Sequence, residues 1–418
     1  MTTALLTFLG GMRDKAVGNK PIYQQTTYRF PDGSEVSTDY FAAALRKKQD
    51  FRQIIIFGTT TSIWEKLAED AGDMELALDL FAQTDEDQGA GLEEASLRKL
   101  EKILSENWGV EVILIAGEGG ITSENVQMEM MRYVGVLQRI HADEILLDFT
   151  HGFRSMPMLL NSALDFWQSL YPVRTPIRMV YGEFRQRSES TVHYLDDIQH
   201  TLRVAQAVRF FFEKMDGSEL AKLVGDFWPS GEKALKDLTI RIQENRLNQI
   251  EAPLRQLLNA LVKMSHPEKA PPWFPPIHVR LKAWIQSIQG NTLPQTLANL
   301  AGVFFTNRLH AQAILALDES LMEAILVARG QPSRTLTAEQ RNEIFKDSMN
   351  DLEKELKDRL WKMHNFRNFV AHGAREDSKQ QGRPPGSLFV QIPNFQELLG
   401  PILLEPESYF RRPELPLK

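Results

Sequence analysis

The sequence of 418 residues contains no cysteine. A disulfide, a thiol nucleophile and a thiolate metal site are therefore excluded, which fits a reducing compartment. Histidine and carboxylates are left as candidate metal ligands, and no pattern among them calls for a metal. No apolar run approaches the roughly 18 residues that cross a membrane. The opening "MTTALLTFLGG" lacks the basic stretch and the cleavage pattern of a signal peptide. We expect a cytoplasmic protein without a membrane anchor.

The chain also lacks an excess of positive charge, because its formal net charge is −7. Indiscriminate nucleic-acid binding needs a basic surface, so any RNA contact should be local, and no DNA binding is expected. The fingerprints GxGxxG and GxxxxGK[ST] are absent as well. A dinucleotide-dependent enzyme and a P-loop NTPase are therefore unsupported.

The first half of the chain alternates between strand-like and helix-like segments. Short continuous apolar runs at residues 4–9, 53–58, 111–117, 144–150 and 177–182 are typical of strands buried on both faces of a parallel sheet. Helical patterns lie between them. This order predicts a Rossmann-like, doubly wound α/β domain, in which ligands bind beyond the carboxyl ends of the strands.

The pattern changes after Arg185. The segment "TVHYLDDIQ" (191–199) is either an edge strand or a linker, and a helical half follows, with helices expected at 200–215, 232–264, 294–328 and 336–370. The Pro-rich segment from residue 382 reads as an irregular tail. We predict an α/β domain at 1–198 and an all-α domain at 199–418, since a chain of this length exceeds one usual core.

The most informative strand end is "DFTHG" at residues 148–152, followed by a helix that starts near Ser155. Backbone N–H groups at a helix start, with Arg154 beside them, can hold an anion. Glycines or hydroxyls also follow the strands at 8–12, 57–62 and 115–123, where they could cradle phosphate or ribose. Plain tight turns of an α/β fold would use the same residue types, so both interpretations stay open.

The segment "DFTHG" matches the DxTHG motif of the CRISPR-associated ribonucleases of type III systems, and "LLTFLGG" and "FGTTTSIW" resemble that family too. The resemblance implies a CARF sensor domain at 1–198 and a HEPN ribonuclease domain at 199–418. It further implies a homodimer, or a higher oligomer, that is activated by a cyclic oligoadenylate, with cyclic tetra-adenylate as the expected form. No other cofactor is implied.

The same resemblance implies which loops bind the activator. Its expected contacts are Gly10, Gly11, Met12, Thr59, Thr60, Ser62, Thr150, His151, Gly152, Arg154 and Ser155. Asp148 is expected to brace its turn rather than touch the ligand. His151 has an alternative role in degrading the activator.

The nuclease signature of the family is an arginine followed, after four to six residues, by a histidine. The bare pattern occurs at Arg187 and His193, at Arg359 and His364, and at Arg367 and His372. The first pair lies in the presumed linker. We prefer the third because it forms Arg-Asn-x-x-x-His and because Gly373 would end the helix just after it. The second pair is the fallback.

The stretch "HNFRNFVAHG" (364–373) raises a geometric difficulty. Phe366, Phe369, Val370 and Gly373 have the spacing of a buried stripe, with Arg367 and His372 off it. A five-residue step turns the side chain by roughly 140°, so this pair cannot meet on one helix. Two copies of the helix across a two-fold axis would bring the residues together. Alternatively, the arginine is simply solvated and the histidine sits at the helix dipole.

The resemblance implies metal-independent cleavage of single-stranded RNA by Arg367, Asn368 and His372, through attack of a 2′-hydroxyl that leaves a 2′,3′-cyclic phosphate. The charges near these residues sum to +6 − 2 = +4, from Arg359, Lys362, Arg367, Arg375, Lys379 and Arg383 against Glu376 and Asp377. A second hypothesis is a non-catalytic, nucleotide-sensing adaptor whose helical half binds a partner.

Overall fold

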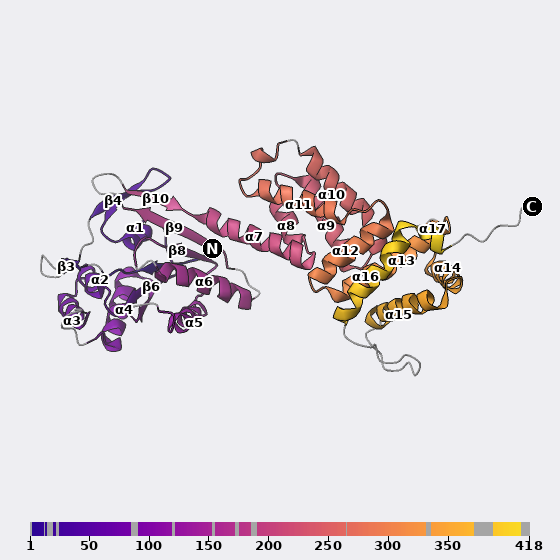
Figure 1. Cartoon of the computed structure of the whole chain (residues 1–418). Coiled ribbons are helices and arrows are strands. Elements are labelled where there is room, and N and C mark those ends of the chain that lie inside the picture. Colours follow the sequence, from indigo (N-terminus) through magenta and orange to yellow (C-terminus); the bar gives the residue numbers. More distant parts are fainter. Residues whose placement is uncertain are drawn as a thin grey trace, which may run out of the picture. The chain divides into compact units, whose positions relative to one another are not determined.

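The computed structural model describes residues 2–11, 13–14, 20–21, 25–84, 91–118, 122–152, 155–171, 175–184, 190–264, 266–331, 336–371 and 388–410. The chain divides into two compact units, Met1–His200 and Thr201–Lys418 (Figure 1). This division falls within helix α7 (Asp196–Lys214). Among the described residues, no helix combines the length and apolar character that a membrane crossing needs.

The first unit is built on one mixed sheet. In spatial order its strands are β5 (Glu35–Thr38), β4 (Thr26–Arg29), β10 (Ser190–Tyr194), β9 (Ile177–Glu183), β8 (Glu144–Asp148), β1 (Thr3–Phe8), β6 (Gln53–Thr59) and β7 (Glu111–Gly117). The five strands from β9 to β7 are parallel. They are the five predicted from apolar runs, and that prediction is confirmed.

The other edge of the sheet differs from the expected all-parallel arrangement. Strand β10 runs antiparallel to β9, β4 runs parallel to β10, and β5 runs antiparallel to β4. The segment left open as strand or linker is thus a strand, β10. The hairpin β4–β5 was missed because its short strands are largely polar and lack an apolar run. Its turn at Gly33, with φ +82°, was the available signal. A separate pair is formed by β2 (Arg13–Asp14) and β3 (Lys20–Pro21).

Helices cover both faces of this sheet. The helices of the first unit are α1 (Phe41–Lys48), α2 (Trp64–Asp70), α3 (Met74–Thr84), α4 (Glu94–Trp108), α5 (Val126–Leu137) and α6 (Ser155–Leu170). Alternate residues of β1 enter different cores: Leu5 packs with residues of α1 to α4, whereas Leu6 packs with residues of α5 and α6. Helices α5 and α6 lie side by side (Figure 1). Burial on both faces explains why the parallel strands are continuously apolar.

The described part of the second unit is helical. Its elements after α7 are α8 (Ser218–Val224), α9 (Pro229–Gln243), the 3₁₀ turn η2 (Leu247–Gln249), α10 (Glu251–Lys263), the 3₁₀ turn η3 (Pro267–Lys269), α11 (Phe274–Ile288), α12 (Leu293–Thr306), α13 (His310–Ala328), α14 (Ala338–Asn350), α15 (Lys354–Ala371), α16 (Leu388–Leu404) and α17 (Pro406–Tyr409). The expected fold class, α/β followed by all-α, is confirmed.

Each of three long helices predicted from the sequence is interrupted in the structure and forms two helices. The backbone turns at Asn245, with φ +54°, and at Arg308, with φ +61°, which breaks the spans 232–264 and 294–328. Helices α14 and α15 replace the third span, 336–370. A left-handed residue ends the ladder of helical hydrogen bonds, and an asparagine or arginine at that position is hard to identify from the sequence.

The expected irregular tail is partly wrong, because α16 and α17 lie within it. Helix α16 contains Pro393 and Pro401, two of the prolines for which the segment was interpreted as irregular. A proline inside a helix costs about 3 kcal/mol. Against this cost, α16 buries five large apolar side chains, each of which contributes roughly 1.5–3 kcal/mol. They are Ile392, Phe395, Leu399, Ile402 and Leu403. Tertiary burial therefore outweighs the local preference.

Candidate functional site

The turn after β8 is anchored by the buried carboxylate of Asp148. Its Oδ2 accepts a 2.7 Å hydrogen bond from the Thr7 hydroxyl, and its Oδ1 accepts one of 2.8 Å from the Thr150 backbone N–H. Burial raises the pKa of Asp148 to about 6, although the bonds from Thr150 and Thr7 oppose this shift. Asp148 ties the turn to β1, as expected of a bracing residue.

Replacing Asp148 with asparagine should reveal this raised pKa. A carboxyl with a raised pKa in the folded state binds its proton more tightly there than in the unfolded chain. Its contribution to stability is therefore complete below about pH 4 and is lost as pH rises through about 6. We therefore expect the difference in melting temperature, native protein minus Asp148→Asn, to decrease between about pH 5 and about pH 7.5. Melting curves of both proteins across this range measure it, and a constant or growing excess would contradict the raised pKa.

His151 links the same turn to the beginning of α1. The backbone N–H of Phe41 donates a 3.2 Å hydrogen bond to His151 Nε2, and the imidazole packs against the ring of Tyr40 with centroids 5.5 Å apart. Burial lowers the pKa of His151 to about 4, while the nearby charge of Asp39 opposes this shift. The imidazole is therefore neutral near pH 7. Its Nε2 lone pair accepts the hydrogen bond that connects this turn to α1.

The loops after β1 and β6 are joined by Ser62. Its Oγ donates to the carbonyl of Leu9 at 2.9 Å and accepts from the backbone N–H of Thr59 at 2.8 Å. The backbone N–H of Ile63 also donates to the carbonyl of Gly10 at 3.0 Å. Ser62 and Thr59 are buried, at 0% and 3% exposure. These two predicted ligand contacts therefore shape the loops, whereas Gly10, Gly11 and Thr60 are partly exposed.

The predicted activator loops meet at one edge of the sheet. They follow β8, β1 and β6, which are adjacent parallel strands, so their carboxyl ends lie together. Thr150 and Gly152 are partly exposed there, and Ser155 is exposed at the first position of α6. Gly152 has φ +107° and packs so closely on Phe8 that an added Cβ would lie 2.7 Å from the Phe8 Cβ. Met12 and Arg154 lie outside the described residues.

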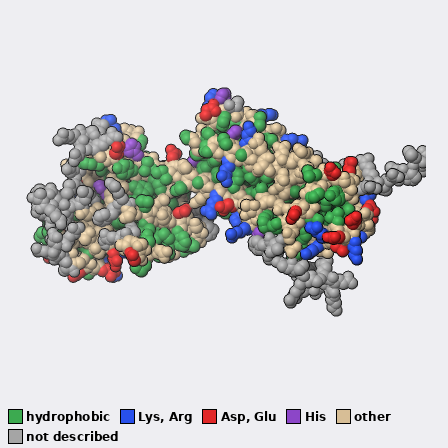
Figure 2. All heavy atoms as spheres, in the orientation of Figure 1, with side chains coloured by type: hydrophobic (Ala, Val, Ile, Leu, Met, Phe, Trp, Pro, Cys, Tyr) green, Lys and Arg blue, Asp and Glu red, His purple; other side chains and the backbone are tan. Residues whose placement is uncertain are grey.

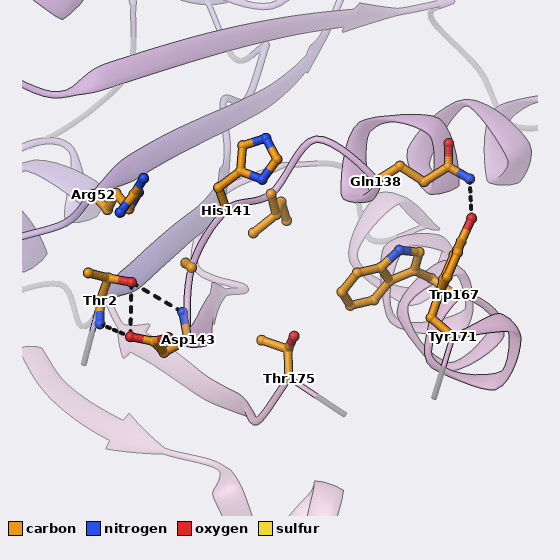
Figure 3. Close-up of a pocket in the computed structure, with 10 residues that line it drawn as sticks. Thr2, Arg52, Gln138, His141, Asp143, Trp167, Tyr171 and Thr175 are labelled. Carbon is orange, nitrogen blue, oxygen red and sulfur yellow. Dashed lines mark hydrogen bonds between the residues drawn. The ribbon is translucent and has the colours of Figure 1, made fainter. Parts of the chain in front are cut away.

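A cavity of about 720 Å³ opens at the opposite, amino-terminal edge (Figure 3). It is lined by Thr2, Arg52, Gln138, Ile140, His141, Ala142, Asp143, Trp167, Tyr171 and Thr175. Asp143 accepts from the Thr2 backbone N–H at 2.7 Å, and Gln138 donates to the Tyr171 hydroxyl at 2.7 Å. Thr2, Arg52 and Asp143 precede the strands β1, β6 and β8. None of the predicted activator contacts that the structure describes lines this cavity.

Arg367 and Asn368, two of the preferred nuclease residues, line a cavity of about 540 Å³ formed by α13, α14 and α15 of the second unit. Its lining consists of Asp318, Glu319, Met322, Leu336, Ala338, Arg341, Asn342, Phe345, Lys346, Trp361, His364, Arg367 and Asn368. On the face displayed in Figure 2, acidic and basic side chains are interspersed over the C-terminal helices. The residues that line the cavity provide hydrogen-bond donors, hydrogen-bond acceptors and aromatic rings.

Arg367 is held on both sides by polar neighbours. Its Nη1 donates a 3.0 Å hydrogen bond to Asn368 Oδ1, and its Nε lies 3.5 Å from Asp318 Oδ2. The side chain of Asp318 is only 8% exposed, whereas that of Arg367 is 36% exposed. Asn368 therefore orients the guanidinium, and Arg367 keeps an accessible surface toward the cavity.

The other histidine of this helix shares the same carboxylate. His364 Nδ1 lies 2.9 Å from Asp318 Oδ1, and its ring packs on Phe345 with centroids 4.7 Å apart. Arg359, its partner in the fallback pair, is exposed and does not line the cavity. The structure therefore brings together Arg367, Asn368 and His364 rather than Arg359 and His364. His193 of the first pair lies on β10 and contacts Glu183.

His372, Gly373 and the charged residues 375–383 lie outside the described residues. The expected apolar stripe is correct for Phe366, which is 4% exposed, and wrong for Phe369, which is 39% exposed. The buried positions of α15 are Leu360, Met363 and Phe366. On an α-helix, each step of three residues shifts the side-chain direction by about 60°. Position 369, three such steps after Leu360, therefore points about 180° away from Leu360 and out of the core.

Asp318 was missed by the sequence argument. Its helix, α13, is buried over most of its surface, and yet it carries Asp318, Glu319 and Glu323. Buried carboxylates are costly unless they are paired, and here Arg341 contacts Glu319 and Glu323 while His364 and Arg367 contact Asp318. Acidic residues within a strongly apolar helix were the available signal. Within the described residues, no group of His, Asp and Glu could hold a metal ion.

Comparison with known proteins finds relatives of this chain. Residues 15–184 match the family model described as "CRISPR system endoribonuclease Csx1, CARF domain". The predicted resemblance to CRISPR-associated CARF ribonucleases is confirmed. The chain is also 20% identical to CRISPR-associated protein MJ1674 of Methanocaldococcus jannaschii over 92% of its own length, and it spans 65% of that relative.

One similar solved structure is Enterococcus italicus Csm6 bound to cyclic hexa-2′-fluoro-hexa-dAMP. The sequence identity is 12% and the TM-score is 0.37, with 97% of this chain and 95% of that chain covered.

Proposed function

We propose that this chain is a metal-independent endoribonuclease for single-stranded RNA that acts as a homodimer and is activated by a cyclic oligoadenylate. The observation that carries the proposal is the cavity of the second unit, which is lined by Arg367 and Asn368 of the Arg-Asn-x-x-x-His sequence. The match of residues 15–184 to the CARF domain of an endoribonuclease family supports it.

The proposed reaction is an internal transfer of the phosphate. The ribose 2′-oxygen attacks the adjacent phosphorus, the bond to the 5′-oxygen of the next nucleotide breaks, and a 2′,3′-cyclic phosphate forms. One proton leaves the 2′-hydroxyl and one reaches the departing 5′-oxygen. His372 is the proposed group for proton transfer, since histidine titrates near neutral pH. Arg367 is the proposed stabiliser of the negative charge that builds on the phosphate oxygens.

The surroundings of Arg367 suit this role. Asn368 accepts a hydrogen bond from Nη1 and Asp318 lies near Nε, so these two neighbours fix the plane of the guanidinium. A planar fork held in place binds phosphate oxygens with less loss of side-chain entropy than a free side chain would. Asp318 also contacts His364 through its Oδ1, so only its Oδ2 lies near Arg367, at 3.5 Å from Nε.

We further propose that two copies of the chain build each nuclease centre. Arg367 and His372 are separated by a step of about 140° around a helix, so convergence requires a second helix. Phe369 of the same helix is 39% exposed, an apolar surface of the kind that a second copy of α15 would cover. On this proposal the cyclic oligoadenylate, itself two-fold symmetric, binds the paired loops that contain Gly10, Thr60 and Thr150.

Activation requires that the ligand bind one arrangement of the dimer better than the other. Among the predicted contacts, the partly exposed ones are the proposed ligand contacts: Gly10, Gly11, Thr60, Thr150, His151 and Gly152. The exposed Ser155 and the undescribed Met12 and Arg154 complete the proposed set. Thr59 and Ser62 instead set the shape of the loop.

The test is cleavage of a fluorogenic single-stranded RNA in the presence of EDTA, with cyclic tetra-adenylate, with cyclic hexa-adenylate and without either. We expect cleavage that depends on one of the rings, with tetra-adenylate the stronger activator, and products that end in a 2′,3′-cyclic phosphate. Activator binding without any cleavage would favour the non-catalytic sensing adaptor. Cleavage that EDTA abolishes would contradict the metal-independent mechanism.

A further inference from the structure

The cavity beside Arg367 is larger than phosphate binding alone requires. Its volume of about 540 Å³ falls in the range of small-molecule sites, whereas a phosphate needs only a shallow cluster of donors. Two walls of different character meet in it. Helix α13 contributes the carboxylates of Asp318 and Glu319, and α15 contributes Trp361 and His364.

The carboxylate wall disfavours a phosphate. Arg341, the cation nearest to it, is shared between Glu319 and Glu323, and Nη2 of Arg341 lies 3.0 Å from Glu323 Oε1. Asp318 already contacts Arg367 and His364. The surface along α13 is therefore rich in acceptors, and the remaining cation of the lining is Lys346, which is exposed on α14. A group that enters here should donate hydrogen bonds and carry no negative charge.

The aromatic wall favours a flat ring. Trp361 is partly exposed and stands nearly perpendicular to the rings of Phe345 and His364, at 83° and 82°. Bases of single-stranded RNA are commonly recognised by stacking on aromatic side chains combined with hydrogen bonds to their edges. Asn342, which is exposed on α14, adds an amide to the cavity rim.

We propose that this cavity is the subsite for one nucleobase next to the cleaved linkage, and that Glu319 selects bases that carry an exocyclic amino group. A carboxylate only accepts hydrogen bonds, so the amino N–H of adenine, cytosine or guanine suits it. Uracil has no amino group on the corresponding edge, where a single N3–H lies between two carbonyl oxygens that the carboxylate repels. This inference rests on the proposed ribonuclease activity and adds a base preference to it.

Glu319 suits mutation because its partner stays paired without it. Glu319 Oε1 contacts Arg341, but Arg341 retains Glu323, whose side chain is 5% exposed. Glu319→Gln therefore removes the selecting charge at nearly constant shape. Asn342→Asp instead adds a negative charge to the cavity. Because Asn342 is exposed, this substitution should leave folding intact. Glu343→Gln, on the exposed surface of α14 outside the cavity, is the control of equal charge change.

The experiment is cleavage of a random-sequence single-stranded RNA by the full-length protein with cyclic tetra-adenylate, followed by sequencing of the cut ends. We expect uracil to be depleted about tenfold at one position next to the cut, since a hydrogen bond to a charged group contributes about that factor. Glu319→Gln should reduce the depletion to about threefold or less, Asn342→Asp should deepen it, and Glu343→Gln should leave it unchanged.

The failure of this inference differs from the failure of the proposed function. Cleavage of the pool by the native protein without any base preference would overturn the subsite, as would a preference that both cavity variants leave unchanged. A change in oligomeric state of these variants without a change in base preference would assign the cavity to a second copy of the chain instead. Absence of all activator-dependent cleavage would reject the ribonuclease activity itself.

Discussion

Arg367→Ala is expected to slow activated cleavage of single-stranded RNA by at least about a hundredfold, because removal of one preorganised donor to the developing charge costs 10² to 10³ in rate. Arg367 lines the cavity, keeps 36% of its side chain exposed and is oriented by Asn368 and Asp318. The lost interaction strengthens only in the transition state, so kcat should fall while KM changes little. Initial rates over a range of RNA concentrations measure both constants.

Three further alanine variants distinguish the two candidate signatures on this helix. His372→Ala should lose as much activity as Arg367→Ala. Arg359→Ala should retain nearly all activity, because Arg359 is exposed outside the cavity. His364→Ala should lose about tenfold or less, since it removes one neighbour of Asp318 but leaves the contact of Asp318 with Arg367. Loss of activity in Arg359→Ala and His364→Ala, with Arg367→Ala active, would identify the fallback pair as the nuclease centre.

The strands of the first unit were readable from the sequence because burial on both faces leaves a continuous apolar run. The hairpin β4–β5 was not, since Thr26–Arg29 and Glu35–Thr38 each have one polar face and only four residues. In the second unit, a proline was given more weight than the apolar spacing around it, so α16 was missed. Sequence patterns thus predicted an element correctly where tertiary burial favours the same structure, and they failed where burial favours a different one.

The candidate sites divide in the same way. The DxTHG turn could be found because a glycine is required where the chain adopts φ +107° against Phe8. The sequence alone does not show whether a hydroxyl at a strand end binds a ligand or forms hydrogen bonds within the loops. In the structure, the hydroxyl of Ser62 bonds with the backbone of Thr59 and Leu9. Asp318 and Arg367 are in contact although they are 49 positions apart in the sequence, and a single sequence carries no record of such a contact.

Gly152→Ala is expected to lower the melting temperature by roughly 5 to 10 °C and to weaken binding of cyclic tetra-adenylate by at least about tenfold. Two costs combine at this position. A side chain at φ +107° carries a strain of about 1 kcal/mol or more, and the added Cβ would lie 2.7 Å from the Phe8 Cβ. Phe8 is fully buried between the sheet and its neighbours and cannot retreat without disturbing the core.

Gly33→Ala is the matched control, because Gly33 also has a positive φ, at +82°, but has no heavy atom within 4 Å of the added Cβ. It should show only the backbone strain, a shift of a few degrees, and unchanged binding. The difference between the two variants isolates the contact of the DxTHG turn with β1. Since Phe8 cannot yield, the turn itself must move, and Gly10 and Gly11 follow Phe8 closely in the loop proposed to bind the activator. Calorimetric titration with cyclic tetra-adenylate measures the effect on binding. Equal effects of the two alanines on stability and binding would remove Gly152 from the proposed activator site.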